Sequence, residues 1–156
     1  MTNGHHFRGD NELSREDWCG LLALADDEKL CTLIDEILSS SGAFGDVQLL
    51  RQVQTGTAQL IVREPVVEER FIIGDSLVTV AEVSFRGTMG WAMRTGSNHH
   101  AAVSAAVADA ILTSSIRELQ DTLLEFLQDV SKSVERERQR EWAMVSATAI
   151  EFEELD

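Results

Sequence analysis

The spacing of apolar residues changes twice along this chain, near residue 46 and near residue 96, and these changes restrict the folds open to it. Outside these points apolar residues recur every three or four positions, as on one face of a helix. Between them apolar and polar residues alternate, as on a strand with one buried face. Helices that precede and follow a series of strands joined by short turns predict an α+β fold with an antiparallel sheet.

Two helices are predicted before the sheet. Ser14 can cap the first, which runs to about residue 25, and the acidic residues at 16 and 17 suit the positive end of its dipole. The second ends at residues 39–42, and the short break between the two predicts a helical hairpin. Its packing face is expected to contact Trp18, Leu21 and Leu22, and consists of Leu30, Leu33, Ile34, Ile37 and Leu38.

The middle region predicts a meander of four or five antiparallel strands with one face free for helices. Residues 47–53 and 58–63 are expected to form a hairpin around a turn at Thr55-Gly56, with Pro65 just after its second strand. Separate strands are predicted at 68–73 and 77–86, divided at Gly74-Asp75. A last strand follows the turn at 86–88.

Long helices are predicted after the sheet, packing on it and on partner chains. The first begins at Ser97 or Asn98 and has a second face of small residues, namely Ala101, Ala102, Ala105 and Ala108. The next carries a near-heptad apolar stripe from Ile116 to Val130. One small sheet has too little surface for all of these faces, so we expect one of them to contact another chain.

The rest of the chain is expected to be more exposed. Residues 132–141 are almost entirely polar, whereas 142–152 hold enough apolar residues to dock in part. The predicted organisation is a flexible N-terminal segment, 1–13, followed by a single domain, 14–156, with an acidic tail.

Charge and cysteine content restrict the partners. Thirteen Lys and Arg against 27 Asp and Glu give a net charge of −14, which repels nucleic acids and anionic membranes. Residues 1–12 lack the apolar run of a signal peptide, and no run is long enough to span a membrane, so we expect a cytoplasmic protein. Cys19 and Cys31 are expected to be buried thiols.

Catalytic motifs are not visible in the sequence. The glycines are too scattered for a phosphate loop, and no serine or cysteine has the context of a nucleophile. His99 and His100 diverge on a helix and His5-His6 lie in the N-terminal segment, so no metal site is expected. Residues such as Asp75, next to a glycine, fit either a turn aspartate or a site residue.

Several groups of residues nevertheless resemble the PhnG family, a core subunit of the bacterial carbon–phosphorus lyase system for using phosphonates. Residues 15–23 resemble its opening helix and 147–152 its closing segment, so the likeness covers most of the chain. Ala101 and Val103 differ from the family pattern, as does the acidic end at 153–156. The matching groups, in chain order, are Thr55-Gly56, Glu69-Arg70-Phe71, Gly74-Asp75, Gly87-Thr88-Met89-Gly90-Trp91, and Gly96 followed by Ala102, Ala106, Asp109 and Ala110.

The resemblance implies a role as a non-catalytic or site-completing subunit of a transferase, not catalytic when alone. With PhnH, PhnI and PhnL it would replace the adenine of ATP by a phosphonate, and PhnJ would later cleave the product with an iron–sulfur cluster and S-adenosylmethionine. ATP is thus the co-substrate of the complex, and this subunit is expected to hold no cofactor. The implied partners are subunits like PhnH, PhnI and PhnJ and ATP-binding proteins like PhnK and PhnL, with self-association when the chain is isolated.

The residues expected to contact a partner or substrate come from the matching groups and the alanine face. They are Glu69, Arg70, Gly74, Asp75, Gly90, Trp91, Gly96, Ala105 and Asp109. Two other hypotheses stay open at this point. One is an unrelated interaction or scaffold protein of the same fold class, and the other is a stand-alone hydrolase with Asp75 or Glu69 as its base.

Overall fold

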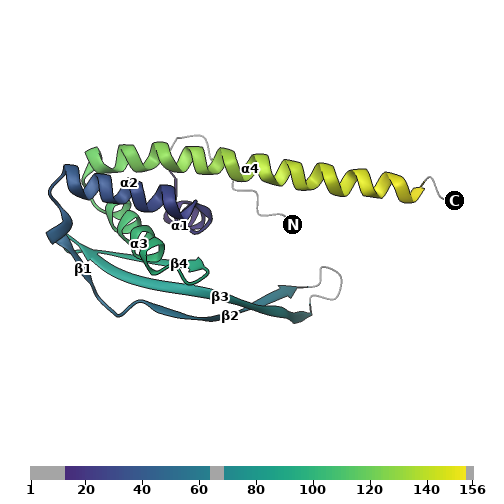
Figure 1. The fold of residues 1–156 in the computed structure, drawn as a ribbon, viewed down its shortest axis with the longest axis horizontal. Coiled ribbons are helices and arrows are strands. Elements are labelled where there is room, and N and C mark those ends of the chain that lie inside the picture. The colour runs from purple at the N-terminus through teal and green to yellow at the C-terminus, as the bar shows by residue number, and fades with distance from the viewer. Residues whose placement is uncertain (1–12, 64–68, 154–156) are drawn as a thin grey trace.

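Strand β3 (Arg70–Phe85) is the centre of the sheet, because each of the other three strands pairs with it in antiparallel fashion. The computed structural model describes residues 13–63 and 69–153. Helices and this sheet together confirm the predicted α+β class (Figure 1). The remaining elements are α1 (Arg15–Leu24), α2 (Asp27–Ser40), the 3-10 turn η1 (Phe44–Asp46), β1 (Val47–Leu49), β2 (Gln54–Arg63), β4 (Thr88–Thr95), α3 (His99–Thr113) and α4 (Arg117–Glu153).

The strand order differs from the predicted meander. Strands β1 and β2 follow one another along one edge of β3, and β4 pairs with the other edge. The expected turn at Thr55-Gly56 is wrong, since both residues lie inside β2 and pair with Thr79 and Val78. The expected break at Gly74-Asp75 is also wrong, because β3 continues through it. The call on Pro65 lies outside the described residues.

All the helices of the described chain lie on one side of the sheet (Figure 1), as the sequence predicted. Helix α3 packs directly on β3 and β4, and helices α1, α2 and α4 all contact α3. The expected helix starts are confirmed: Ser14 caps α1 in a capping box with Asp17, and Asn98 caps α3 by accepting from the amide of Ala101. Helices α1 and α2 follow one another closely, and each has α3 as a main neighbour.

The alanine-rich face of α3 is not a surface for another chain, contrary to the prediction. Ala101, Ala102, Ala105 and Ala108 are all 0% exposed within this single chain. Their small side chains let the other helices approach α3 closely. The predicted stripe on α4 is covered as well, since Leu123 and Leu127 are fully buried.

Helix α4 is one continuous helix of 37 residues that extends well past the body of the protein (Figure 1). The expectation that the chain docks from residue 142 onward is wrong for Trp142, which is 72% exposed. No helix of the described chain is long and apolar enough to cross a membrane.

Candidate functional site

The most connected polar group of the described chain is the carboxylate of Asp109, on α3, which is 0% exposed. From α1, Arg15 donates to it through Nε at 3.1 Å and a terminal nitrogen at 2.7 Å, and Trp18 Nε1 donates at 2.9 Å. The backbone amide of Trp91, on β4, donates to Oδ2 at 2.9 Å. Asp109 therefore joins α1, α3 and β4 at one point.

These hydrogen bonds decide the charge state of Asp109. Burial by itself disfavours a charged carboxylate, but the donors Arg15, Trp18 and the Trp91 amide outweigh it and hold the pKa below the ordinary value of 3.8. The group is therefore an anion at neutral pH. Both oxygens of Asp109 already accept hydrogen bonds and neither is exposed to solvent. Asp109 therefore holds α1, α3 and β4 together and is not positioned to take a proton from a substrate.

Gly90 allows α3 to come close enough for this contact. A Cβ atom at Gly90 would overlap the carbonyl oxygen of Ala106 and lie 2.7 Å from the Cβ of Ala110. Real Cβ atoms do not approach that closely, so only glycine fits between β4 and α3 here. The next residue is Trp91, whose amide reaches Asp109.

A shallow hollow of about 220 Å³ lies next to this cluster, between α1 and β4. Cys19 lines it together with Trp91 and Met93, both of which are more than 40% exposed. Burial and the neighbouring Asp109 carboxylate raise the pKa of the Cys19 thiol to about 11, so the thiolate nucleophile is scarce at neutral pH. Both cysteines are free and half-buried, which is less burial than the sequence predicted.

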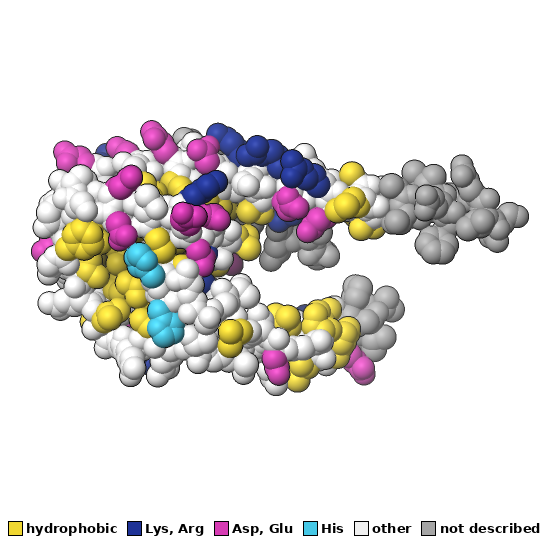
Figure 2. Space-filling model, in the orientation of Figure 1, with side chains coloured by type: hydrophobic (Ala, Val, Ile, Leu, Met, Phe, Trp, Pro, Cys, Tyr) yellow, Lys and Arg dark blue, Asp and Glu magenta, His cyan; other side chains and the backbone are white. Residues whose placement is uncertain are grey.

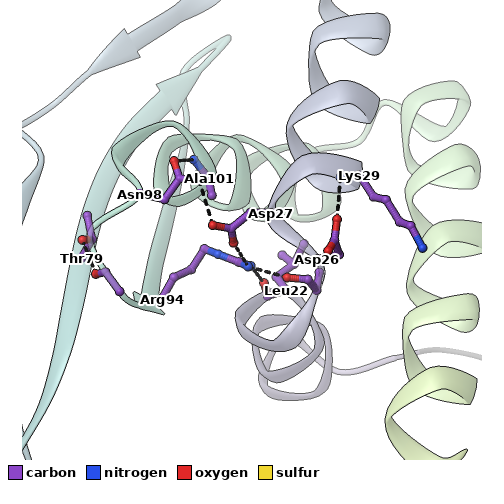
Figure 3. Close-up of polar contacts among 10 residues, drawn as sticks. Leu22, Asp26, Asp27, Lys29, Thr79, Arg94, Asn98 and Ala101 are labelled. Atoms are coloured by element: carbon purple, nitrogen blue, oxygen red, sulfur yellow. Dashed lines mark hydrogen bonds and ion pairs between the residues drawn. The ribbon is translucent and has the colours of Figure 1, made fainter.

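Arg94 forms a second buried polar cluster (Figure 3). Its guanidinium donates to the carbonyl oxygens of Leu22 and Ala25 at the end of α1, and to Asp27 at 2.7 Å. Asp27 also accepts from Asn98 at 2.8 Å. Burial opposes ionisation of Asp27, but the hydrogen bonds from Arg94 and Asn98 lower its pKa overall. Arg94 thus satisfies backbone acceptors that the helix end leaves unpaired.

The two histidines of α3 point to different neighbours, as their divergence on a helix predicted. His100 lies 3.5 Å from Asp35 on α2, whereas His99 Nε2 lies 2.9 Å from the Thr55 hydroxyl. The Thr79 hydroxyl donates to the Gly96 carbonyl oxygen, so it can only accept from the Thr55 hydroxyl. Because the single proton of Thr55 is used in that bond, Thr55 accepts from His99. No group of three or more His, Cys, Asp or Glu side chains that could hold a metal ion occurs in the described part of the chain.

The residues singled out from the sequence fall into two regions. Gly90, Trp91 and Asp109 form one cluster, and Ala105 is buried on the same helix as Asp109. Gly96 forms the turn after β4, with a φ of +93°. By contrast, an extension of β2 and β3 beyond β4 carries Glu69, Arg70, Gly74 and Asp75, of which all but the half-buried Gly74 are exposed.

Arg94 was missed in the sequence, although a signal for it exists. It shares the alternation of Gly90 and Ala92, both of which are buried, so a charged residue occupies an inward position of β4. An inward charge on a strand needs a partner, and Asp27 is that partner.

Comparison with known families gives one match. The model of the family described as phosphonate metabolism protein PhnG matches residues 13–155, which is nearly the whole chain.

Proposed function

This chain belongs to the PhnG family of phosphonate metabolism proteins, and from that premise we propose that it acts as a non-catalytic subunit of the carbon–phosphorus lyase machinery. In this role it works with PhnH, PhnI and PhnL in the transfer of the ribose triphosphate of ATP to a phosphonate, with release of adenine. The iron–sulfur cluster and S-adenosylmethionine belong to the later step on PhnJ. This subunit is proposed to act in the cytoplasm and to need no cofactor of its own.

The observation that carries the proposal is the family match over residues 13–155. The geometry supports a non-catalytic part in it. Asp109, the one fully buried carboxylate among the residues that the structure describes, has both oxygens occupied by donors from this same chain. The Cys19 thiol, with a pKa of about 11, is a poor nucleophile at neutral pH. Neither group is therefore suited to act on a substrate, which supports the assignment of the reaction to other subunits.

The family match also removes one alternative that the sequence left open, the unrelated scaffold protein. The stand-alone hydrolase with Asp75 or Glu69 as its base gains no support from the geometry. Both side chains are exposed on the extension of β2 and β3, where water surrounds them. A general base usually needs a sheltered position within hydrogen-bond reach of the proton that it removes.

The proposal predicts a stable complex with other subunits. An affinity-tagged copy of this chain is co-expressed with PhnH-, PhnI- and PhnJ-like proteins from the same genome. The mass of the purified complex is then measured by native mass spectrometry. We expect the partners to copurify in fixed stoichiometry through size-exclusion chromatography. A chain that is recovered folded but alone, with all partners soluble in the same cells, contradicts the proposal.

A further inference from the structure

Strands β2 and β3 continue past the end of β4 as a two-stranded ribbon, made of residues 57–63 and 70–77. Strand β4 pairs with β3 only from Val78 onward, so no third strand from the described part of the chain pairs with the ribbon. Figure 1 shows it extending away from the helices below the projecting part of α4. An isolated two-stranded ribbon is marginally stable in water.

Both faces of the ribbon carry large apolar side chains, and the face of Ile61 and Ile72 also carries Arg63, Arg70 and Asp75. Along β2, Leu60 and Val62 alternate with Ile61, and the register pairs Val62 with Phe71 and Ile61 with Ile72. Successive side chains on a strand point to opposite faces, so each face carries large apolar groups. Figure 2 shows them as yellow side chains along the lower extension of the molecule. The exposed fractions run from 39% to 58% for Leu60, Ile61, Val62, Phe71, Ile72, Ile73 and Leu77.

A contiguous apolar surface of this kind marks a binding site, because a free domain would bury or replace it. A contact that covers one face of the ribbon would leave the other face in water. Two ribbons packed face to face would also leave the outer apolar face of each ribbon in water. The occupant must therefore enclose the ribbon on two sides.

Net charge argues against a second copy of this chain as the occupant. Each chain carries −14, so two copies repel each other, and a nucleic acid would be repelled too. The complementary partner is a neutral or basic protein. Within the ribbon itself, Arg63 lies directly opposite Arg70, on the same face as Ile61 and Ile72, so the partner must offer polar or acidic groups to these two guanidinium groups beside the apolar slot.

We propose that the ribbon inserts into a two-walled apolar slot on another subunit, one that is less acidic than this chain. The inference rests on the proposed function, which supplies the partner. Insertion covers Ile61, Ile72 and Leu77 with one wall and Leu60, Val62 and Phe71 with the other. The free edges of β2 and β3 in the ribbon also offer backbone groups to the strands of that partner.

The test compares charges placed on opposite faces. Ile61→Glu and Phe71→Glu are made in the full chain, and binding to the co-expressed partner subunits is measured by biolayer interferometry after circular dichroism confirms folding. Each variant is expected to weaken binding on the order of 100-fold, because a carboxylate loses its hydration in an apolar slot. The control, Leu24→Glu, changes a residue of α1 that is 62% exposed and is expected to bind like the wild type.

The outcomes separate the inference from the proposed function. If the wild type assembles and neither ribbon variant weakens binding, the inference fails and the proposed function stands. If one face alone is sensitive, the two-walled slot is wrong. A wild-type dimer in sedimentation equilibrium that both ribbon variants dissociate assigns the ribbon to a second copy and overturns the inference. A wild type that binds none of the subunits overturns both.

Discussion

Substituting Gly90 by alanine is expected to destabilise the fold by about 3 kcal/mol. The new Cβ would overlap the carbonyl oxygen of Ala106 and crowd Ala110, and both belong to the rigid backbone and core of α3. Strand β4 and helix α3 would have to separate, which also stretches the contact between Trp91 and Asp109. The free energy of unfolding from urea titrations gives the measurement.

A matched glycine on the neighbouring strand provides the control. Gly74 lies in β3, and a Cβ built there meets no atom within 4 Å. Gly74→Ala is therefore expected to change the free energy of unfolding by less than about 0.5 kcal/mol. Equal effects from the two substitutions would show that close packing of α3 on β4 is not what Gly90 provides.

Replacing Asp109 by alanine is expected to cost about 3 kcal/mol at neutral pH. The change removes the acceptor for Arg15, Trp18 and the Trp91 amide together. Arg15 can turn to solvent because its side chain is half exposed, so the main penalty comes from the two tryptophan donors left unpaired. Asp35→Ala is the control, since the ion pair recorded for that carboxylate among the described residues is with an exposed histidine 3.5 Å away, and its loss should matter little.

The same variant predicts a pH dependence. The pKa of Asp109 is lower in the folded protein than the ordinary 3.8, so its contribution is complete above about pH 4 and is lost as the pH falls through the folded value. The stability difference between wild type and Asp109→Ala should therefore shrink on acidification below about pH 4. A difference that stays constant from pH 6 to pH 3 would mean that the charge of Asp109 contributes nothing.

Local sequence signals predicted the helices and the fold class well. The Ser14 cap, the Asn98 cap and the polar end of α2 are each encoded within a few residues, so the boundaries of α1, α2 and α3 follow from them. Strand pairing is not local in this way. Alternation shows that residues 70–85 are extended, but a Gly-Asp pair inside a long strand resembles the one that ends a strand.

The sequence also predicted more apolar surface than one domain can bury, and placed it wrongly. The small side chains of α3 predict a contact surface, although Ala105 is enclosed by this chain. Alanine fits a core between closely packed helices as well as it fits an interface. The exposed apolar surface lies instead on the ribbon, where alternation gave no indication that β4 ends too early to cover it.

In the sequence, Asp109 is marked only by the resemblance to a family and by no chemical pattern around it. The sequence around an aspartate on an alanine-rich helix does not indicate which groups donate hydrogen bonds to it. Two of these donors, Arg15 and Trp18, lie more than 90 residues away in sequence. Gly90 is similar, because its role depends on the helix that crosses it. Such contacts depend on tertiary structure, which spacing within a segment does not encode.

The role of this chain in phosphonate use is tested most directly by an omission assay. Purified PhnH-, PhnI- and PhnL-like proteins are mixed with ATP and methylphosphonate, with or without this chain, and adenine release is followed by liquid chromatography. The account predicts release when all proteins are present, none without this chain, and none from this chain alone. Undiminished adenine release without the chain, or release by the isolated chain, would contradict it.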